Sequence, residues 1–520
     1  MTLLPPLGLL AITVLVIAAG LAFSRPGRRP RRVPRVAEAA AALSLVLALA
    51  GVAQLVAVDS ATFAIGEGPL ALGVRVDGIS ATMTVLVAFV GWIVVRYART
   101  YVDGEAREGL FHGLMLATLA AVLLLVQAGT LLVLVAAFAT VGLGLRHLLL
   151  FYPDRPEARR AATKFTLVWG MGDAALMIAA TGLWIAFGTT DIAALTQAAA
   201  AGLPMAARIA VGFLVLAALL KTAAFPLHGW LTEVMEAPTP VSALLHAGII
   251  NGGGFLLIRL AEVMQASPGA MAALVLLGGL TALFGAVVML TQSAIKTALA
   301  WSTVAQMGFM ILQCGLGLWT LALLHIVAHS LYKAHAFLAS GTAVEAVNAI
   351  RKPGPVAVPG LVAVGRSFAL AITLYALVAV GFSLVAGEKS AQALALGAML
   401  IFGVAYLVAQ GMADAAPTAL TRRTLTASAG ATLAYFGFQA LAAALWGPAL
   451  PQPPDPGALE WALIVLAVAS FGLVAFAQAL FPLWAHHPAS AGLRVHLANG
   501  LYLNALLDRL IGGFRSAKPL

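Results

Sequence analysis

The segment from Lys221 to Arg259 reads K-T-A-A-F-P-L-H-G-W-L-T-E-V-M-E-A-P-T-P-V-S-A-L-L-H-A-G-I-I-N-G-G-G-F-L-L-I-R. Its apolar background is typical of a membrane span, yet it contains ionisable side chains at Lys221, Glu233, Glu236 and His246. A charge at the bilayer centre costs about 2.5–3.5 kcal/mol even on the most lenient insertion scale. These side chains therefore need a charged partner or a water-filled surrounding.

The same segment contains three prolines, Pro226, Pro238 and Pro240. Proline lacks a backbone N–H and interrupts helical hydrogen bonding. Interrupted backbone at membrane depth is tolerated only where it is buried in protein or lines a cavity. Intramembrane charge and interrupted backbone together predict a transport pathway.

The composition predicts an all-α polytopic membrane protein. The chain is 62% hydrophobic and only 10% charged, and apolar runs long enough to cross a ~30 Å hydrocarbon layer recur throughout it. We expect about fifteen transmembrane helices, at about 3–23, 37–58, 79–97, 110–127, 129–150, 164–187, 207–226, 240–261, 269–291, 297–316, 318–340, 366–387, 390–411, 425–446 and 458–482.

Basic residues predict the orientation of these helices. If the arginine-rich segment that begins at Ser24, S-R-P-G-R-R-P-R-R-V-P-R-V, is cytoplasmic, most of the 30 Lys and Arg residues, Lys164 among them, fall on that side. We therefore expect a multi-pass protein of the cell inner membrane with its N-terminus outside and its C-terminus in the cytoplasm. The net charge of +10 then reflects a solvated rim beside the lipid bilayer, and nucleic acid is not an expected partner.

Two lysines, Lys221 and Lys333, fit no loop and are predicted to lie within the membrane. Lys333 follows His325 and His329 at intervals of four residues, so the three side chains share one helix face. This stripe predicts a proton path. Metal binding by the two histidines is disfavoured because no nearby carboxylate or cysteine completes a ligand set, and a structural hydrogen bond is an alternative for either histidine.

One further carboxylate, Asp173, lies inside a predicted span, in W-G-M-G-D-A-A-L. It either pairs with an intramembrane lysine or contributes to a helix packing contact, and the sequence favours neither. The segment that begins at Thr62 alternates apolar and polar residues around glycines, which predicts an external hairpin.

Three motifs carry a family resemblance. The runs that begin at Met235 (M-E-A-P-T-P-V-S-A-L-L-H-A), Ala300 (A-W-S-T-V-A-Q-M-G-F-M) and His325 (H-I-V-A-H-S-L-Y-K-A-H-A-F-L-A-S-G) resemble the proton-conducting membrane subunits shared by respiratory complex I and the multisubunit cation/proton antiporters. The resemblance is good over roughly residues 60 to 345. Within that superfamily, Glu236 before A-P-T-P and the run N-G-G-G-F-L-L-I-R from Asn251 are most similar to the DabB branch, the membrane subunit of the DAB inorganic-carbon accumulation complex.

The resemblance implies two inverted five-helix repeats, each with a discontinuous helix. The first break is expected at Phe225 and Pro226. The implied proton or cation pathway consists of Lys221, His246, His325, His329 and Lys333. The expected units are 1–109, with helices 1–3 and the hairpin; 110–262, the first repeat; 263–411, the second repeat; 412–482, the last two helices; and 483–520, a cytoplasmic amphipathic tail.

The chain also departs from the family pattern. Ala139 stands where complex I subunits usually carry a glutamate that tunes the lysine of the first repeat. Glu233, Glu236 and Asp173 are the candidate replacements. The lysine motif expected on the twelfth helix is also missing, and the tail replaces the long lateral helix of the distal complex I subunit.

The resemblance implies a transport subunit and not an enzyme. It would use a cation gradient, expected to be of protons, to energise inorganic carbon uptake by a large cytoplasmic, zinc-containing partner of the DabA type, similar to beta-carbonic anhydrases. No cofactor or metal site is expected in this chain. The alternatives are a proton-pumping subunit of a complex I-like redox complex, a Na⁺/H⁺ antiporter subunit, and a non-conducting membrane anchor.

Overall fold

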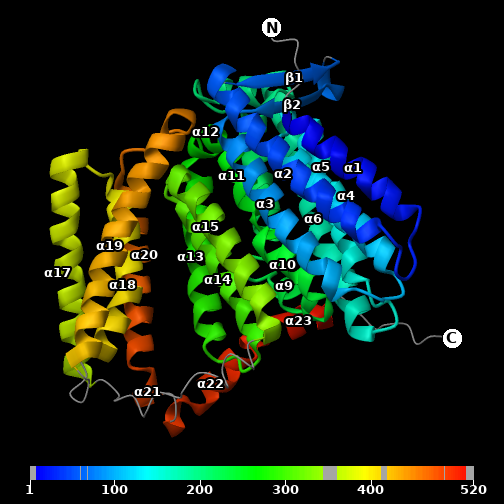
Figure 1. The fold of residues 1–520 in the computed structure, drawn as a ribbon. Coiled ribbons are helices and arrows are strands. Elements are labelled where there is room, and N and C mark those ends of the chain that lie inside the picture. The colour runs from blue at the N-terminus through cyan, green and yellow to red at the C-terminus, as the bar shows by residue number, and fades with distance from the viewer. Residues whose placement is uncertain are drawn as a thin grey trace.

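The computed structural model describes residues 7–58, 60–66, 68–342, 360–411, 418–484 and 487–510, and almost all of them are helical (Figure 1). The long helices are α1 (Leu7–Phe23), α2 (Val33–Val58), α3 (Gly78–Tyr101), α4 (Glu108–Val126), α5 (Leu131–Leu149), α6 (Pro156–Phe187), α8 (Met205–Lys221), α13 (Pro268–Met289), α14 (Ile295–Gly315), α15 (Trp319–Ala339), α17 (Leu361–Ala386), α18 (Ala391–Gly411), α19 (Thr418–Trp446) and α20 (Ala458–Ala479). Shorter helices are α7 (Ile192–Ala199), α9 (Gly229–Thr232), α10 (Thr239–Ala247), α11 (Gly252–Arg259), α12 (Ala261–Gln265), α21 (Phe481–Trp484), α22 (Ala491–Ala498) and α23 (Leu503–Leu510).

These helices confirm a polytopic membrane protein. In the described residues, 12 helical stretches are long and apolar enough to cross a membrane, and α1 and Ala391–Gly403 of α18 are shorter apolar helices. All fifteen expected spans overlap a helix or a series of short helices. The exact count of fifteen, the inverted repeats and the unit boundaries stay predictions.

A two-stranded hairpin closes one end of the bundle (Figure 1). Strands β1 (Ala61–Ile65) and β2 (Leu72–Val76) pair antiparallel, which confirms the predicted hairpin. Asp77 then caps α3, since its carboxylate accepts a hydrogen bond from the Ser80 N–H at 2.9 Å. The hairpin therefore leads directly into a membrane-spanning helix.

The helix that carries Lys221 is interrupted in the structure. Helix α8 ends at Lys221, and the chain resumes helical structure only at α9. The predicted break at Phe225 and Pro226 lies inside this gap, where the Phe225 N–H donates to Thr281 Oγ1 at 3.0 Å. A side chain of α13 thus satisfies a backbone group that the interruption frees.

The most deeply buried span follows this interruption and runs from Thr239 to Arg259 through α10 and α11. Glycine permits its close packing. A Cβ added at Gly253 would lie 2.6 Å from the Ala218 carbonyl oxygen of α8. Any larger residue would push α11 away from the helix that ends at Lys221.

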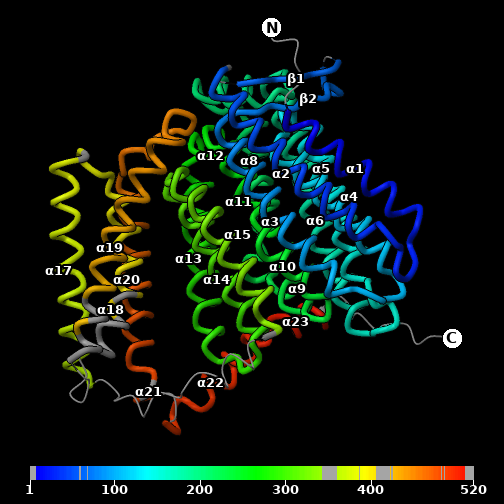
Figure 2. The backbone as a smooth tube through the Cα atoms, in the orientation of Figure 1, coloured from blue at the N-terminus to red at the C-terminus, as the bar shows by residue number. Residues whose placement is uncertain are grey.

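Helices α17–α20 form a separate group beside α13–α15 (Figure 1). Buried apolar side chains of α1–α15 form one large core, which also includes Ala442 and Trp446 of α19. A second core joins α13–α15 to α18 and α20, and a third lies within α17–α20 around Phe368, Phe402 and Phe436. After α20, helices α21–α23 cross the end of the bundle opposite the hairpin and return beneath α9 (Figure 2). The C-terminal segment therefore lies beside the interrupted region.

Candidate ion-conduction site

Lys221 lies at the C-terminal end of α8 and has no solvent exposure. Its Nζ is 2.6 Å from Oδ1 of Asp173 on α6. The same nitrogen lies 4.6 Å from the ring centroid of Phe138 and 4.2 Å from that of Trp169. An ion pair and two aromatic faces thus offset the loss of hydration of the buried ammonium.

The structure shows which of the three candidate carboxylates, Asp173, Glu233 and Glu236, contacts Lys221. Asp173 is its ion-pair partner, whereas Glu233 contacts Lys164 and the exposed Glu236 lies 3.2 Å from Arg155. Helix α5, which lacks a carboxylate at Ala139, contributes the neighbouring Phe138 ring instead. The pairing of Asp173 answers a question that the sequence left open.

His246 on α10 is fully buried and contacts α14. Its Nδ1 is 3.1 Å from Thr303 Oγ1, and its ring stacks on Phe337 at 4.3 Å between centroids. The Nε2 atom has no hydrogen-bond partner among the described residues. This nitrogen is therefore available to a water molecule or a proton.

Lys333 on α15 is also fully buried, but neutral groups hold it. Its Nζ donates to the Leu299 carbonyl oxygen at 3.0 Å and to Ser302 Oγ at 2.9 Å, both on α14. In the described part of the chain, no carboxylate forms an ion pair with it. Because Ser302 and Thr303 are consecutive, α14 connects the Lys333 and His246 sites.

His325 and His329 precede Lys333 on α15, with ring centroids 6.0 Å apart. His325 Nδ1 is 2.7 Å from Gln313 Oε1, whereas neither ring nitrogen of His329 has a partner among the described residues. Both histidines line a cavity of about 770 Å³ between α13–α15 and α18–α20. The described residues contain no group of three or more His, Cys, Asp or Glu side chains that could hold a metal ion.

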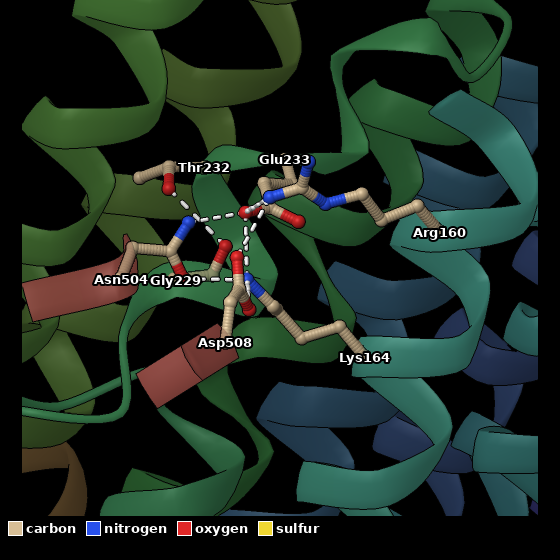
Figure 3. Close-up of polar contacts among 7 residues, drawn as sticks. All are labelled: Arg160, Lys164, Gly229, Thr232, Glu233, Asn504 and Asp508. Atoms are coloured by element: carbon tan, nitrogen blue, oxygen red, sulfur yellow. Dashed lines mark hydrogen bonds and ion pairs between the residues drawn. The ribbon is translucent and has the colours of Figure 1, made fainter. Parts of the chain in front are cut away.

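The sequence missed several residues of this region. Lys164 was counted with the solvated rim, but it lies inside α6, its side chain is 6% exposed, and it contacts Glu233 (Figure 3). The sequence also gave no partner for Arg259, whose buried side chain pairs at 2.6 Å with Asp77, directly after the hairpin. Burial acts to raise the pKa of Asp77, but Arg259, the Ser80 N–H and Arg75 together hold that pKa below its ordinary value.

Asn251 was quoted only as part of a family motif, yet its side chain connects two helices. Its Nδ2 donates to Ser330 Oγ of α15 at 3.0 Å and to the Ala247 carbonyl oxygen at 3.1 Å. A polar residue in an apolar run is the signal that could have found it. The contact fixes α10 against the helix that carries Lys333.

The fold and these buried polar contacts define a polytopic membrane protein of the transport class. Residues 128–415 match the family described as "NADH:quinone oxidoreductase/Mrp antiporter, TM", and residues 63–112 match the N-terminus of complex I chain 5. The chain is 36% identical to "Probable inorganic carbon transporter subunit DabB2" of Halothiobacillus neapolitanus, over 97% of this chain and 92% of that protein. It belongs to the NADH:quinone oxidoreductase/Mrp antiporter membrane family and, within it, groups with the DabB inorganic carbon transporter subunits.

Other similar proteins belong to complex I and to an Mrp complex. NADH-quinone oxidoreductase subunit L of Mycobacterium tuberculosis is 33% identical over 76% of this chain and 62% of its own length. The Mrp complex of Dietzia sp. contains a similar fold, with a TM-score of 0.67 and 24% identity over 97% of this chain and 59% of that one. A chain of Thermus thermophilus complex I has a TM-score of 0.56 and 22% identity, over 96% of this chain and 99% of that one. These structures support the fold.

Proposed function

We propose that this protein conducts a cation, the proton, through the membrane and thereby energises inorganic carbon uptake. The observation that carries the proposal is the buried pair of Lys221 and Asp173, located where α8 is interrupted. Buried intramembrane charges of this kind mark ion pathways and proton relays. The similarity to an inorganic carbon transporter subunit over nearly the whole chain supplies the substrate class.

The polar groups suit a relay in two parts. Lys221 exchanges a proton with Asp173, and His246 then connects this site through α14 to Lys333. From Lys333 the row continues along α15 through His329 to His325. Three contacts support this relay: the Lys221–Asp173 ion pair, the consecutive α14 residues Thr303 and Ser302 that contact His246 and Lys333, and the neighbouring rings of His329 and His325.

The chemistry of carbon capture belongs to a partner in this proposal. Hydration of carbon dioxide at neutral pH uses a metal-activated hydroxide. We assign it to a large zinc-containing cytoplasmic subunit of the DabA type, similar to beta-carbonic anhydrases. The N-terminus would face outward, and the C-terminal tail would lie on the partner's side of the inner membrane.

Growth of a carbonic anhydrase-deficient bacterium in air tests the proposal. The chain, co-expressed with its zinc-containing partner, is expected to restore growth, and Lys221→Ala and Lys333→Ala are expected to abolish it. Lys389→Ala is the matched control, because Lys389 lies in the loop between α17 and α18. Full rescue by either pathway variant would contradict the role of that lysine, and unchanged rescue by both would favour a simple membrane anchor.

A redox pump or a Na⁺/H⁺ antiporter is the second candidate. The 33% identity to complex I subunit L favours it. It predicts sodium-dependent or quinone-dependent proton movement and no rescue of growth in air. Proton flux measured with and without sodium, in membranes that contain the chain and its partner, separates it from the carbon proposal.

A further inference from the structure

The C-terminal helix α23 is seated on the charged cluster at the start of the interrupted region. Lys164 Nζ of α6 lies 2.7 Å from Glu233 Oε1, 2.6 Å from Asn504 Oδ1 and 2.6 Å from Asp508 Oδ1 (Figure 3). Asn504 and Asp508 are one helical turn apart on α23 and share one face of it. Two side chains from the end of the chain thus complete the surroundings of a buried lysine.

The remaining contacts balance the charge of this cluster. Arg160, one turn before Lys164 on α6, donates to Asp508 Oδ2 at 2.7 Å, and Asn504 Nδ2 donates to Glu233 (Figure 3). Two cations therefore meet two carboxylates. Without α23, the cluster of Arg160, Lys164 and Glu233 would lose the Asp508 carboxylate and would carry a net positive charge.

The backbone of α9 and the turn before α23 both permit the contact between Asn504 and the cluster. A Cβ at Gly229 of α9 would overlap with Oδ1 of Asn504, so glycine permits the seating. Gly500, Leu501 and Tyr502 have φ values of 58°, 54° and 58°, a left-handed turn that starts α23. Just before this turn, the Ala498 carbonyl oxygen accepts a hydrogen bond from Gln292 at 3.2 Å.

The cluster also lies on the approach to the Lys221 site. Lys164 precedes Asp173 by nine residues of α6, which corresponds to roughly 13 Å along the helix. Between them, Trp230 of α9 packs against Phe165 and Trp169 of α6, and its indole donates to the Leu220 carbonyl oxygen. Helix α6 thus contacts both the cluster and Lys221, and Trp230 of α9 packs against α6 between them.

We propose that α23 is a gate at this end of the Lys221 pathway. When α23 is docked, Asn504 and Asp508 bind Lys164, and Asn504 also binds Glu233. These contacts close the aqueous approach to Lys221. The transported cation reaches Lys221 from this end only when α23 leaves. This inference rests on the proposed conduction function and adds its regulation by the chain's own C-terminal segment.

Two measurements on the full chain in proteoliposomes test the gate. A Thr232→Cys variant places a thiol on α9, where Thr232 Oγ1 donates to the carbonyl oxygen of Gly229, the residue on which Asn504 is seated, while the native Cys314 is buried. Asp508→Ala in this background is expected to speed labelling by a membrane-impermeant maleimide. Without the reporter cysteine, Asp508→Ala is expected to raise dye-detected proton flux about tenfold, the scale of one lost charge-assisted contact.

Two further variants serve as controls. Arg509→Ala removes an exposed charge next to Asp508 and should change neither labelling nor flux. Gly229→Ala should displace α23 from the opposite side and reproduce both effects of Asp508→Ala.

Each outcome decides the inference. Equal labelling of Thr232→Cys with and without Asp508→Ala would show that α23 does not cover the cluster, and the gate would be rejected whatever the flux. Faster labelling with flux equal to that of the unsubstituted chain would reject gating although α23 docks. If no variant conducts while labelling responds, the conduction function fails, and the gate fails with it.

Discussion

The two buried lysines, Lys221 and Lys333, are equally hidden from solvent but are stabilised in different ways. Lys221 has a carboxylate partner and two aromatic faces, whereas Lys333 has a carbonyl oxygen, a hydroxyl oxygen and the more distant ring of Tyr332 at 5.6 Å, with no carboxylate partner among the described residues. An ion pair favours the charged ammonium strongly, and neutral dipoles favour it less. The two lysines therefore depend on different partners, and variants that remove those partners test the two sites separately.

The largest effect is expected from Asp173→Ala, which leaves the Lys221 ammonium buried without its counter-ion. Removing one partner of a buried ion pair costs about 3–5 kcal/mol. We expect a large loss of thermal stability in detergent and loss of growth rescue in air. Thermal unfolding monitored by tryptophan fluorescence measures the first effect.

The double variant Asp173→Ala/Lys221→Met sharpens this test, because it removes both charges together. Stability should return toward that of the unsubstituted protein, while growth rescue should stay absent. If Asp173→Ala alone were as stable as the unsubstituted chain, the ion pair would not hold Lys221, and the contrast with Lys333 would disappear.

A second ion pair, Asp77 with Arg259, provides a matched comparison away from the two lysines. Asp77→Ala should cost about 3 kcal/mol, at the lower end of the range for buried pairs, since Asp77 is 13% exposed. We expect reduced thermal stability but retained proton flux per folded molecule. Loss of flux at full stability would place this pair in the pathway.

The pH dependence of the Asp77 contribution has a definite sign. Because the folded-state pKa of Asp77 is lowered, its stabilisation is present above the ordinary pKa of 3.8 and is lost as pH falls through the folded-state value. Asp77→Ala should therefore lose this acid dependence. Unfolding midpoints measured from about pH 5 down to about pH 2 check the difference.

The sequence was sufficient to predict the helical fold and to find the two lysines. Apolar runs determine spans locally, and Lys221 and Lys333 stand out because they fall inside such runs. The hairpin before α3 was visible for the same reason, since alternation is a local pattern. Their roles in conduction stay predictions.

Partners could not be predicted from the sequence, because they depend on how helices pack. Asp173 and Lys221 are 48 residues apart, and Lys164 and Asp508 are 344 residues apart, so no local pattern relates them. The assignment of Lys164 to the solvated rim was wrong because it rested on charge alone. Helix α6 begins at Pro156, so Lys164 lies within the helix and is buried. The docking of α23 was missed for the same reason.

Ser302→Ala probes the Lys333 side of the comparison and should have a smaller effect than Asp173→Ala. It removes one of the two acceptors of Lys333 and leaves the Leu299 carbonyl oxygen. A hydrogen bond to a charged group contributes about 1.5–3 kcal/mol, so we expect roughly a tenfold fall in proton flux and no loss of assembly. An effect as large as that of Asp173→Ala would mean that both lysines depend on a single partner.

The smallest effect is expected from Thr303→Val, which keeps the shape of the side chain but removes the hydroxyl next to His246. A neutral hydrogen bond contributes about 0.5–1.5 kcal/mol, so flux should fall only severalfold. Because Thr303 and Ser302 are neighbours on α14, the double variant tests whether the His246 and Lys333 sites act in series. Independent sites should give additive changes in the logarithm of the flux, whereas sites coupled through α14 should give a double variant that departs clearly from that sum.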